Sequence, residues 1–210
     1  MGRNWVDWHA AYDEPGSSLY RRLALVRQRI REALDARPPG PITVISMCAG
    51  QGRDLLGVLA DHPRRADVAA TLVELDPHNV ALAEQTATGL NVTVVAADAG
   101  LSTEYAGAVP ADIALVCGVF GNISDDDIRH TVGWLPRLCR PGATVIWTRH
   151  RRAPDLTPTV REWFADAGFA EVAFDTADTL SIGVGTHRLT GRPLPFEPDV
   201  RLFEFVADRV

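Results

Sequence analysis

The chain has 210 residues, 46% of them hydrophobic, and its 21 basic and 27 acidic residues give a formal net charge of −6. This length and apolar content fit one domain over residues 1–210, with 1–40 as a helical appendage or lid and 41–210 as the core. The acidic balance argues against a nucleic-acid partner, which would require neutralisation of phosphates. No apolar run approaches the roughly 18 residues that span a bilayer, so we expect a cytoplasmic protein without a membrane partner.

The three cysteines Cys48, Cys117 and Cys139 are far apart and odd in number, which fits free thiols in a reducing compartment. They lack the paired spacing of a zinc site, and the acidic residues form no ligand cluster, so we predict no metal. The acidic run 125–127 is instead typical of the first turn of a helix. The sequence leaves both a monomer and a homodimer open.

Apolar periodicity predicts a first helix from Ser17 or Ser18 to about Ala36, ended by the sequence RPPGP. The predicted strands after it are 42–47, 69–74, 91–96, 111–117, 143–148, 169–174, 179–184 and 201–206. The predicted helices between them are 53–59, 77–88, 125–138 and 158–167. This alternation predicts a mostly parallel sheet, covered by helices on both faces, that ends in antiparallel strands.

The turn after the first strand, CAGQG over residues 48–52, has glycines that allow backbone N–H groups to approach a ligand closely. Leu55 stands where the third glycine of a dinucleotide-binding turn belongs, which disfavours a pyrophosphate. Glu74, at the end of the second strand, can accept hydrogen bonds from both hydroxyls of a ribose. Asp98, after the third strand, can accept one from an adenine amino group. These strand ends predict an adenosyl ligand.

Five segments in this order, ISMCAGQGRD, LVELDP, VVAADA, ADIALVCGVFGN and CRPGATVIW, resemble the motifs of class I S-adenosylmethionine-dependent methyltransferases. The resemblance covers 42–206 and implies a Rossmann-like, doubly wound α/β fold. This fold has a mostly parallel seven-stranded sheet, an antiparallel C-terminal strand and, here, an N-terminal helical lid. The last run, RLFEFV at 201–206, fits the family's reversed strand between the fifth and sixth strands.

The resemblance also implies S-adenosylmethionine as the cofactor and S-adenosylhomocysteine as its product. The cofactor-binding residues that it implies are Cys48, Ala49, Gly50, Gly52, Glu74, Leu75, Asp98, Ala99, Cys117, Gly118 and Arg21.

The chain departs from the family pattern at the start of the first motif, where many members have an acidic residue. Ser46 or the neighbouring Ile45 stands there. We therefore expect the methionine amino group to be held by backbone carbonyls near Gly50 and Gly118. Arg21 or its neighbour Arg22 is expected to pair with the methionine carboxylate, because an arginine fork suits a carboxylate. A solvated basic helix face accounts for these arginines equally well.

The segment 117–122 follows the fourth strand, where the resemblance places the approach of the methyl acceptor. It lacks the Asn/Asp-Pro-Pro-Tyr signature of enzymes that methylate amide or exocyclic base nitrogens. Asn122 either orients the substrate or caps the helix that follows. Phe120 either contacts the substrate or packs in the core.

The run WTRHRR at 147–152 follows the fifth strand and therefore lies near the same rim. Its basic groups favour an anionic acceptor, contacted by Trp147, Arg149 and His150, although an ordinary solvated turn is the alternative. His150 is the first candidate for a general base, because its unperturbed pKa is near neutrality.

The N-terminal segment is rich in aromatic and polar residues and resembles a lid that excludes water. Trp8 is a candidate substrate contact there, and His9 and Tyr12 are secondary candidates for a base. His187, among the late strands, is a further histidine that could reach the pocket.

These observations predict a methyltransferase that transfers a methyl group by in-line displacement to a small molecule, anionic acceptors included. A methyltransferase acting on RNA or protein is the first alternative. A protein that binds S-adenosylmethionine on the same scaffold without methylating is the second. A nicotinamide-dependent oxidoreductase is the third, and the missing third glycine disfavours it.

Overall fold

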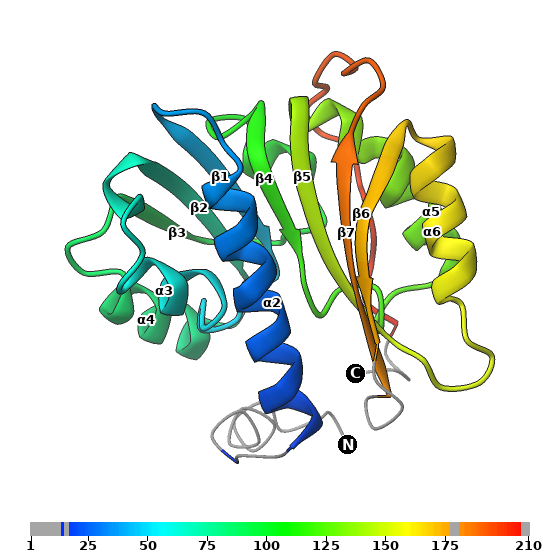
Figure 1. Cartoon of the computed structure of the whole chain (residues 1–210), viewed down its shortest axis with the longest axis horizontal. Coiled ribbons are helices and arrows are strands. Elements are labelled where there is room, and N and C mark those ends of the chain that lie inside the picture. The colour runs from blue at the N-terminus through cyan, green and yellow to red at the C-terminus, as the bar shows by residue number, and fades with distance from the viewer. Residues whose placement is uncertain (1–13, 15–16, 177–180, 207–210) are drawn as a thin grey trace.

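The computed structural model describes residues 14, 17–176 and 181–206. Within these residues, one seven-stranded sheet has the strand order β3-β2-β1-β4-β5-β7-β6, with helices on both of its faces (Figure 1). Strands β1 to β6 run parallel, and β7 runs antiparallel between β5 and β6. This architecture confirms the predicted fold.

The strands are β1 (Ile42–Met47), β2 (Val68–Glu74), β3 (Val92–Ala96), β4 (Ala111–Val116), β5 (Cys139–His150), β6 (Phe169–Asp175) and β7 (Ile182–Leu189). The α-helices are α2 (Ser18–Asp35), α3 (Leu55–Leu59), α4 (Pro77–Thr86), α5 (Asp125–Trp134) and α6 (Thr157–Asp166). Short 3-10 helices are η1 (Arg65–Asp67), η2 (Ser102–Tyr105) and η3 (Leu135–Arg137).

The central strands are buried on both sides because helices cover both faces of the sheet. Every residue of β4 is buried, and so are five of the six residues of β1. Helices α2, α3 and α4 pack on one face, and α5 and α6 pack on the other. Near-continuous apolar strands of this kind are typical of parallel sheets. Their carboxyl ends meet at one edge, which is where a ligand site is expected.

Helix α2 begins where the sequence predicts it. The Ser17 hydroxyl accepts a hydrogen bond from the Tyr20 N–H at 2.9 Å, which caps the first turn. The buried residues Val26, Ile30 and Leu34 follow at helical spacing and hold α2 on the sheet. At the far end, the Arg64 guanidinium donates to the carbonyls of Leu34 and the loop after it. The helix is thereby fixed at both ends.

The identity of the reversed strand is a correction to the sequence prediction. The antiparallel strand between β5 and β6 is β7, and 201–206 is not a strand of the sheet. The segment 200–206 is called here the C-terminal strap. Its β-type pairing is limited to two isolated bridges, one to Leu101 and one to Ile123. Two consecutive residues of the strap, Leu202 and Phe203, are buried. In a strand with one covered face, buried and exposed residues would alternate.

Trp147 and Phe120 are core residues, which corrects the prediction that Trp147 contacts substrate and leaves core packing of the two roles expected for Phe120. Both side chains have no exposed surface. The Trp147 ring stacks on Phe164 with ring centroids 5.8 Å apart, and Phe120 lies 5.9 Å from Trp147. In strand β5 successive side chains point to opposite faces. Trp147 therefore points into the α6 layer of the core.

His187 belongs to the same core and does not reach a pocket. Its Nδ1 accepts a hydrogen bond from the Trp147 Nε1–H at 3.1 Å, and its ring stacks on Phe164 with centroids 4.4 Å apart. Burial lowers the pKa of His187 from 6.5 to about 4, although the nearby Glu171 carboxylate acts in the opposite direction. The imidazole is therefore neutral in the folded protein near pH 7.

This burial predicts a specific pH dependence of stability. As the pH falls from 6.5 to 4, the unfolded chain takes up a proton on His187 that the folded chain does not bind. The free energy of unfolding should therefore decrease by about 3 kcal/mol from this group alone. The His187→Asn variant, whose amide oxygen can still accept from Trp147, should lack this part of the decrease in urea unfolding. The exposed His130→Asn is the control, and a wild-type slope in H187N would contradict the prediction.

Candidate functional site

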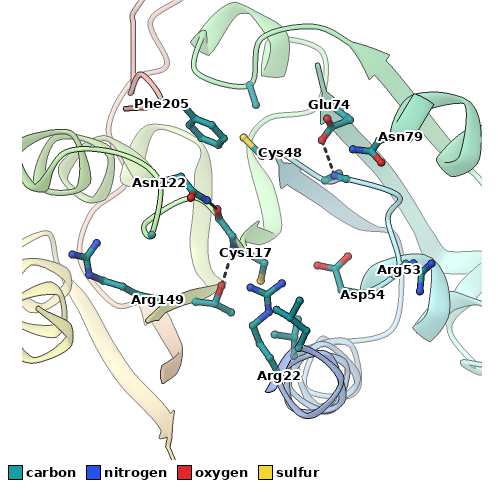
Figure 2. Close-up of a pocket in the computed structure, with 18 of the residues that line it drawn as sticks. Arg22, Cys48, Arg53, Asp54, Glu74, Asn79, Cys117, Asn122, Arg149 and Phe205 are labelled. Atoms are coloured by element: carbon teal, nitrogen blue, oxygen red, sulfur yellow. Dashed lines mark hydrogen bonds between the residues drawn. The ribbon is translucent and has the colours of Figure 1, made fainter. Parts of the chain in front are cut away.

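The carboxyl ends of β1 to β5 open onto a cleft of about 960 Å³ (Figure 2). The turns after these strands form its floor, helix α2 forms one wall, and the C-terminal strap forms another. The site therefore draws on segments from nearly the whole described chain.

The turn after β1 holds a non-glycine residue in the left-handed region. Cys48 has a φ of 49°, a conformation that costs a residue with a Cβ roughly 1 kcal/mol. The Ala49 N–H donates to the Val73 carbonyl at 3.0 Å, which ties the turn to β2. Cys48, Ala49 and Gly50 line the cleft, as the sequence predicts.

Gly52 has a packing role, which corrects its prediction as a ligand contact. It has a φ of +66° and is not among the residues that line the cleft. A Cβ at this position would lie 2.7 Å from Leu56 and 2.9 Å from Leu72. Glycine here lets helix α3 approach β2 closely.

Glu74 is held at the end of β2 by two backbone donors. Its Oε2 accepts from the Gly50 N–H at 2.7 Å, and its Oε1 accepts from the Asp76 N–H at 2.9 Å (Figure 2). The residue is only 8% exposed, yet it lines the cleft. Each carboxylate oxygen has a further lone pair, so the group can still accept hydrogen bonds from a ligand.

The end of the cleft beyond Glu74 combines an apolar surface with a carboxylate. Leu75 is 69% exposed there, which is unusual for a large aliphatic side chain. Asp98 and Ala99, after β3, line the same region. The Asp98 Oδ1 accepts from the Gly100 N–H at 2.8 Å, and its Oδ2 forms an ion pair with Arg201. All three residues line the cleft, and their predicted contacts with the cofactor stay predictions.

On the α2 side, the cleft contains an opposite-charge pair of side chains. Figure 2 shows Arg22 extending from α2 toward Asp54, which follows the glycine-rich turn. Of the two arginines expected at the methionine carboxylate, Arg21 is exposed and does not line the cleft, whereas Arg22 lines it. The two differ because neighbouring residues on a helix point about 100° apart.

Asp54 is a lining residue that sequence reasoning missed. Burial raises the pKa of its carboxyl group, while the Leu55 N–H, Arg22 and Arg27 act in the opposite direction. The Leu55 N–H donates to Asp54 Oδ1 at 2.7 Å. The only signal was its position two residues after Gly52, within the first motif.

Two thiols complete the walls of the cleft. Burial raises the pKa of Cys48 well above its usual range, and the Glu74 and Asp98 carboxylates add to the effect. Burial raises the pKa of Cys117 in the same way. Both thiols are therefore protonated at neutral pH and are poor nucleophiles. They serve as small, neutral parts of the wall.

The loop after β4 is fixed by internal hydrogen bonds. The Gly118 N–H donates to the Thr148 Oγ1 at 2.9 Å, and the Asn122 side chain donates to the Gly118 carbonyl at 2.6 Å. Ser124 caps helix α5 through the Asp127 N–H. Of the two roles predicted for Asn122, capping is therefore wrong, and Asn122 lines the cleft.

The end of β5 carries three basic residues that line the cleft, Arg149, His150 and Arg152. Arg149 is buried, and its guanidinium donates to the Phe120 carbonyl and, at 3.4 Å, to Asp125 Oδ1. It therefore braces the loop after β4 against α5. The His150 ring lies beside Gly121, where an added Cβ would be 3.5 Å from His150 Cδ2. Arg152 is exposed.

Trp8, His9 and Tyr12 lie outside the described residues, so their predicted roles stay predictions. Over residues 17–176 and 181–206, no three His, Cys, Asp or Glu side chains are grouped as a metal ion would require. In the same part of the chain, no helix is both long enough and apolar enough to cross a bilayer.

No protein-family model matches the chain, and a search of curated proteins finds no match. Its fold is similar to those of several solved structures, among them two methyltransferases and a cyclase. Magnesium protoporphyrin IX methyltransferase from Synechocystis PCC 6803, solved with S-adenosylmethionine bound, has 13% identity and a TM-score of 0.69, over 89% of this chain and 92% of that one. A Burkholderia thailandensis 1,6-didemethyltoxoflavin-N1-methyltransferase, solved with 1,6-didemethyltoxoflavin and S-adenosylhomocysteine, has 21% identity and a TM-score of 0.61, over 89% and 87%.

The third structure, the cyclase SpnF, has 16% identity and a TM-score of 0.55, over 79% of this chain and 80% of that one. Two further matched proteins are longer, and the chain spans 68% and 57% of their lengths. The chain therefore has the fold of the class I S-adenosylmethionine-dependent methyltransferases, which confirms the resemblance seen in the five motifs. At these identities the likeness establishes the fold and not the reaction.

Proposed function

We propose that this protein is an S-adenosylmethionine-dependent methyltransferase that acts on a small, anionic molecule. The observation that carries the proposal is the Glu74 carboxylate, which two backbone N–H groups hold at the edge of the cleft. A carboxylate so placed, beside a turn that exposes backbone, suits the two hydroxyls of a ribose.

The residues on either side of Glu74 fit the two ends of the cofactor. Leu75 offers an apolar surface for the flat base, and Asp98 offers an acceptor for its amino group. At the other end, Arg22 fits the methionine carboxylate, and Asp54 fits the methionine ammonium. In this proposal Asp54 replaces the backbone carbonyls near Gly50 and Gly118 that we expected at the methionine amino group. Ser46 is only 2% exposed and does not line the cleft.

When bound, the cofactor supplies a methyl group on a positively charged sulfur, and an acceptor displaces the sulfur in line. The chain's own contribution is to hold the acceptor close and aligned, which is worth up to roughly 7 to 11 kcal/mol in favourable cases. The bonds from Gly118 to Thr148 and from Asn122 to Gly118 make the loop beside the acceptor rigid. His150, next to Gly121, is the residue that we propose removes a proton from a hydroxyl acceptor.

The size and charge of the cleft support a small anionic acceptor. A volume of about 960 Å³ lies at the upper end of small-molecule sites. Arg152 is exposed and lines the cleft two residues after His150, so its guanidinium can attract and orient an anion.

One observation favours a second candidate function. The cyclase SpnF shares the fold with the two methyltransferases, so a protein that binds the same cofactor without transferring methyl is consistent with this architecture. Turnover of the cofactor to S-adenosylhomocysteine in the presence of an acceptor distinguishes the two functions.

The ribose assignment predicts a loss of cofactor affinity in Glu74→Gln. Calorimetric titration of the wild type should give tight binding of S-adenosylhomocysteine and none of NAD. In E74Q the dissociation constant should rise by at least about tenfold, which is 1.4 kcal/mol, because the amide cannot accept from both hydroxyls while keeping its two backbone bonds. The exposed Glu84→Gln is the control. Failure of the folded wild type to bind, or preference for NAD, would contradict the proposal.

The assignment of Arg22 and Asp54 predicts discrimination between two ligands. 5′-Methylthioadenosine has the adenosine and the thioether of S-adenosylhomocysteine but lacks its amino-acid group. Arg22→Gln and Asp54→Asn should each weaken S-adenosylhomocysteine about tenfold, since each removes a charge-assisted hydrogen bond, and should leave 5′-methylthioadenosine unchanged. Arg21→Gln, on the adjacent and exposed arginine, should affect neither ligand. Equal losses of affinity for both ligands would show that Arg22 and Asp54 do not bind the amino-acid group.

A further inference from the structure

The C-terminal strap, residues 200–206, is built into the wall of the cleft. The Leu202 N–H donates to the Gly100 carbonyl at 2.7 Å, and the Ser102 N–H donates to the Val200 carbonyl at 2.9 Å. The side chains of Leu202 and Phe203 are buried in the core behind these bonds. The strap is therefore a fixed part of the fold along the loop after β3.

Gly100 shows how closely the strap approaches this loop. A Cβ added at Gly100 would lie 2.4 Å from the Phe203 carbonyl oxygen. Real Cβ atoms do not come this close to backbone, so only glycine fits without moving the strap. The backbone of the strap and the backbone next to Asp98 are thereby in direct contact.

The strap also reaches the loop after β4. Phe205 forms an antiparallel bridge with Ile123, and the Val206 N–H donates to the Asn122 carbonyl at 2.9 Å. The Phe205 ring projects toward the cleft near Cys48 and Asn122, and 39% of the residue is exposed (Figure 2). The strap thus joins the loop after β3 to the loop after β4.

Arg201 is the strap residue that pairs with Asp98, the predicted partner of the adenine amino group. Its guanidinium pairs with Asp98 Oδ2, while the Gly100 N–H holds Asp98 Oδ1 at 2.8 Å. The Asp98 carboxylate raises the pKa of Arg201, so the guanidinium stays charged. Both oxygens of Asp98 are therefore held, one from the strap and one from its own loop.

We propose that Arg201 is a positioning residue that holds the Asp98 carboxylate in place to accept a hydrogen bond from the amino group of the adenine base. This inference rests on the proposed function, in which Asp98 accepts a hydrogen bond from that amino group. The Asp98 side chain is 43% exposed, and without Arg201 only the Gly100 N–H would hold it. With both oxygens held, the carboxylate keeps one orientation at the cleft before the ligand arrives. Such preorganisation increases affinity without any new contact to the ligand.

The test compares two ligands whose bases differ at the group that contacts Asp98 and at the neighbouring N1, which carries a proton only in the inosine form. S-Inosylhomocysteine has a carbonyl oxygen where S-adenosylhomocysteine has the amino group. The wild type should prefer S-adenosylhomocysteine, because the carbonyl oxygen offers no proton to the carboxylate. In Arg201→Gln, S-adenosylhomocysteine should bind about tenfold more weakly, and S-inosylhomocysteine should bind as before. The preference should therefore shrink by the same factor. Arg201→Lys, which keeps the charge, should restore part of it.

A matched control comes from the opposite edge of the sheet. Arg161 pairs with Glu171 at a similar exposure, 40% and 33% against 42% and 43% for Arg201 and Asp98. Arg161→Gln should leave the affinity for both ligands unchanged. Thermal unfolding of each variant without ligand reports whether the fold is intact.

The outcomes separate the inference from the proposed function. An unchanged preference in R201Q, tighter binding of S-adenosylhomocysteine, or an equal loss for both ligands would each overturn the role of Arg201. A wild type that binds both ligands equally would overturn it as well, while the proposed cofactor would stand. A folded wild type that binds neither ligand would overturn the proposed function and this inference together.

Discussion

The hydrogen bond from the Gly50 N–H to the Glu74 carboxylate is the constraint on which the cleft depends. It joins the turn after β1 to the end of β2, the two central pieces of the floor. The turn can make this bond because Cys48 adopts a φ of 49°, which directs the following backbone toward β2. The cost of that conformation, roughly 1 kcal/mol, is offset by the bond to a charged acceptor, which contributes about 1.5 to 3 kcal/mol. The strained turn and the buried carboxylate therefore stabilise each other.

Electrostatics in the cleft follow from local pairs more than from the net charge of −6. Asp98 pairs with Arg201, and Arg149 contacts Asp125. The thiols of Cys48 and Cys117 stay neutral because burial raises their pKa values. Arg22 and Asp54 offer both signs of charge at one end of the cleft, whereas a uniform field would favour one sign only. This arrangement suits a zwitterionic cofactor in an acidic protein.

The sequence predicted those parts of the fold that depend on local signals. Strand β1, the glycine-rich turn and Glu74 lie within one short stretch, and apolar periodicity together with the turn residues defines them. The start of α2 was also predictable, because the Ser17 cap is a local interaction. Trp147 was assigned wrongly and the role of Phe120 was left open. Their positions in the sequence show that they lie near the rim, whereas the face that each side chain occupies depends on packing against α6. The same holds for Arg21 and Arg22, because which of the two lines the cleft depends on the side of α2 that faces the sheet.

The strap was the least predictable element, because its contacts join residues about a hundred positions apart. RLFEFV alternates enough to indicate a strand, and only the tertiary structure shows that β7 already occupies the place between β5 and β6. With that place taken, the segment packs against the loops after β3 and β4, where Gly100 leaves room for its backbone. The same contacts place Arg201 at Asp98 and Val206 at Asn122. One segment thus fixes the loops after β3 and β4 together, so a shift at either loop is opposed by the core that buries Leu202 and Phe203.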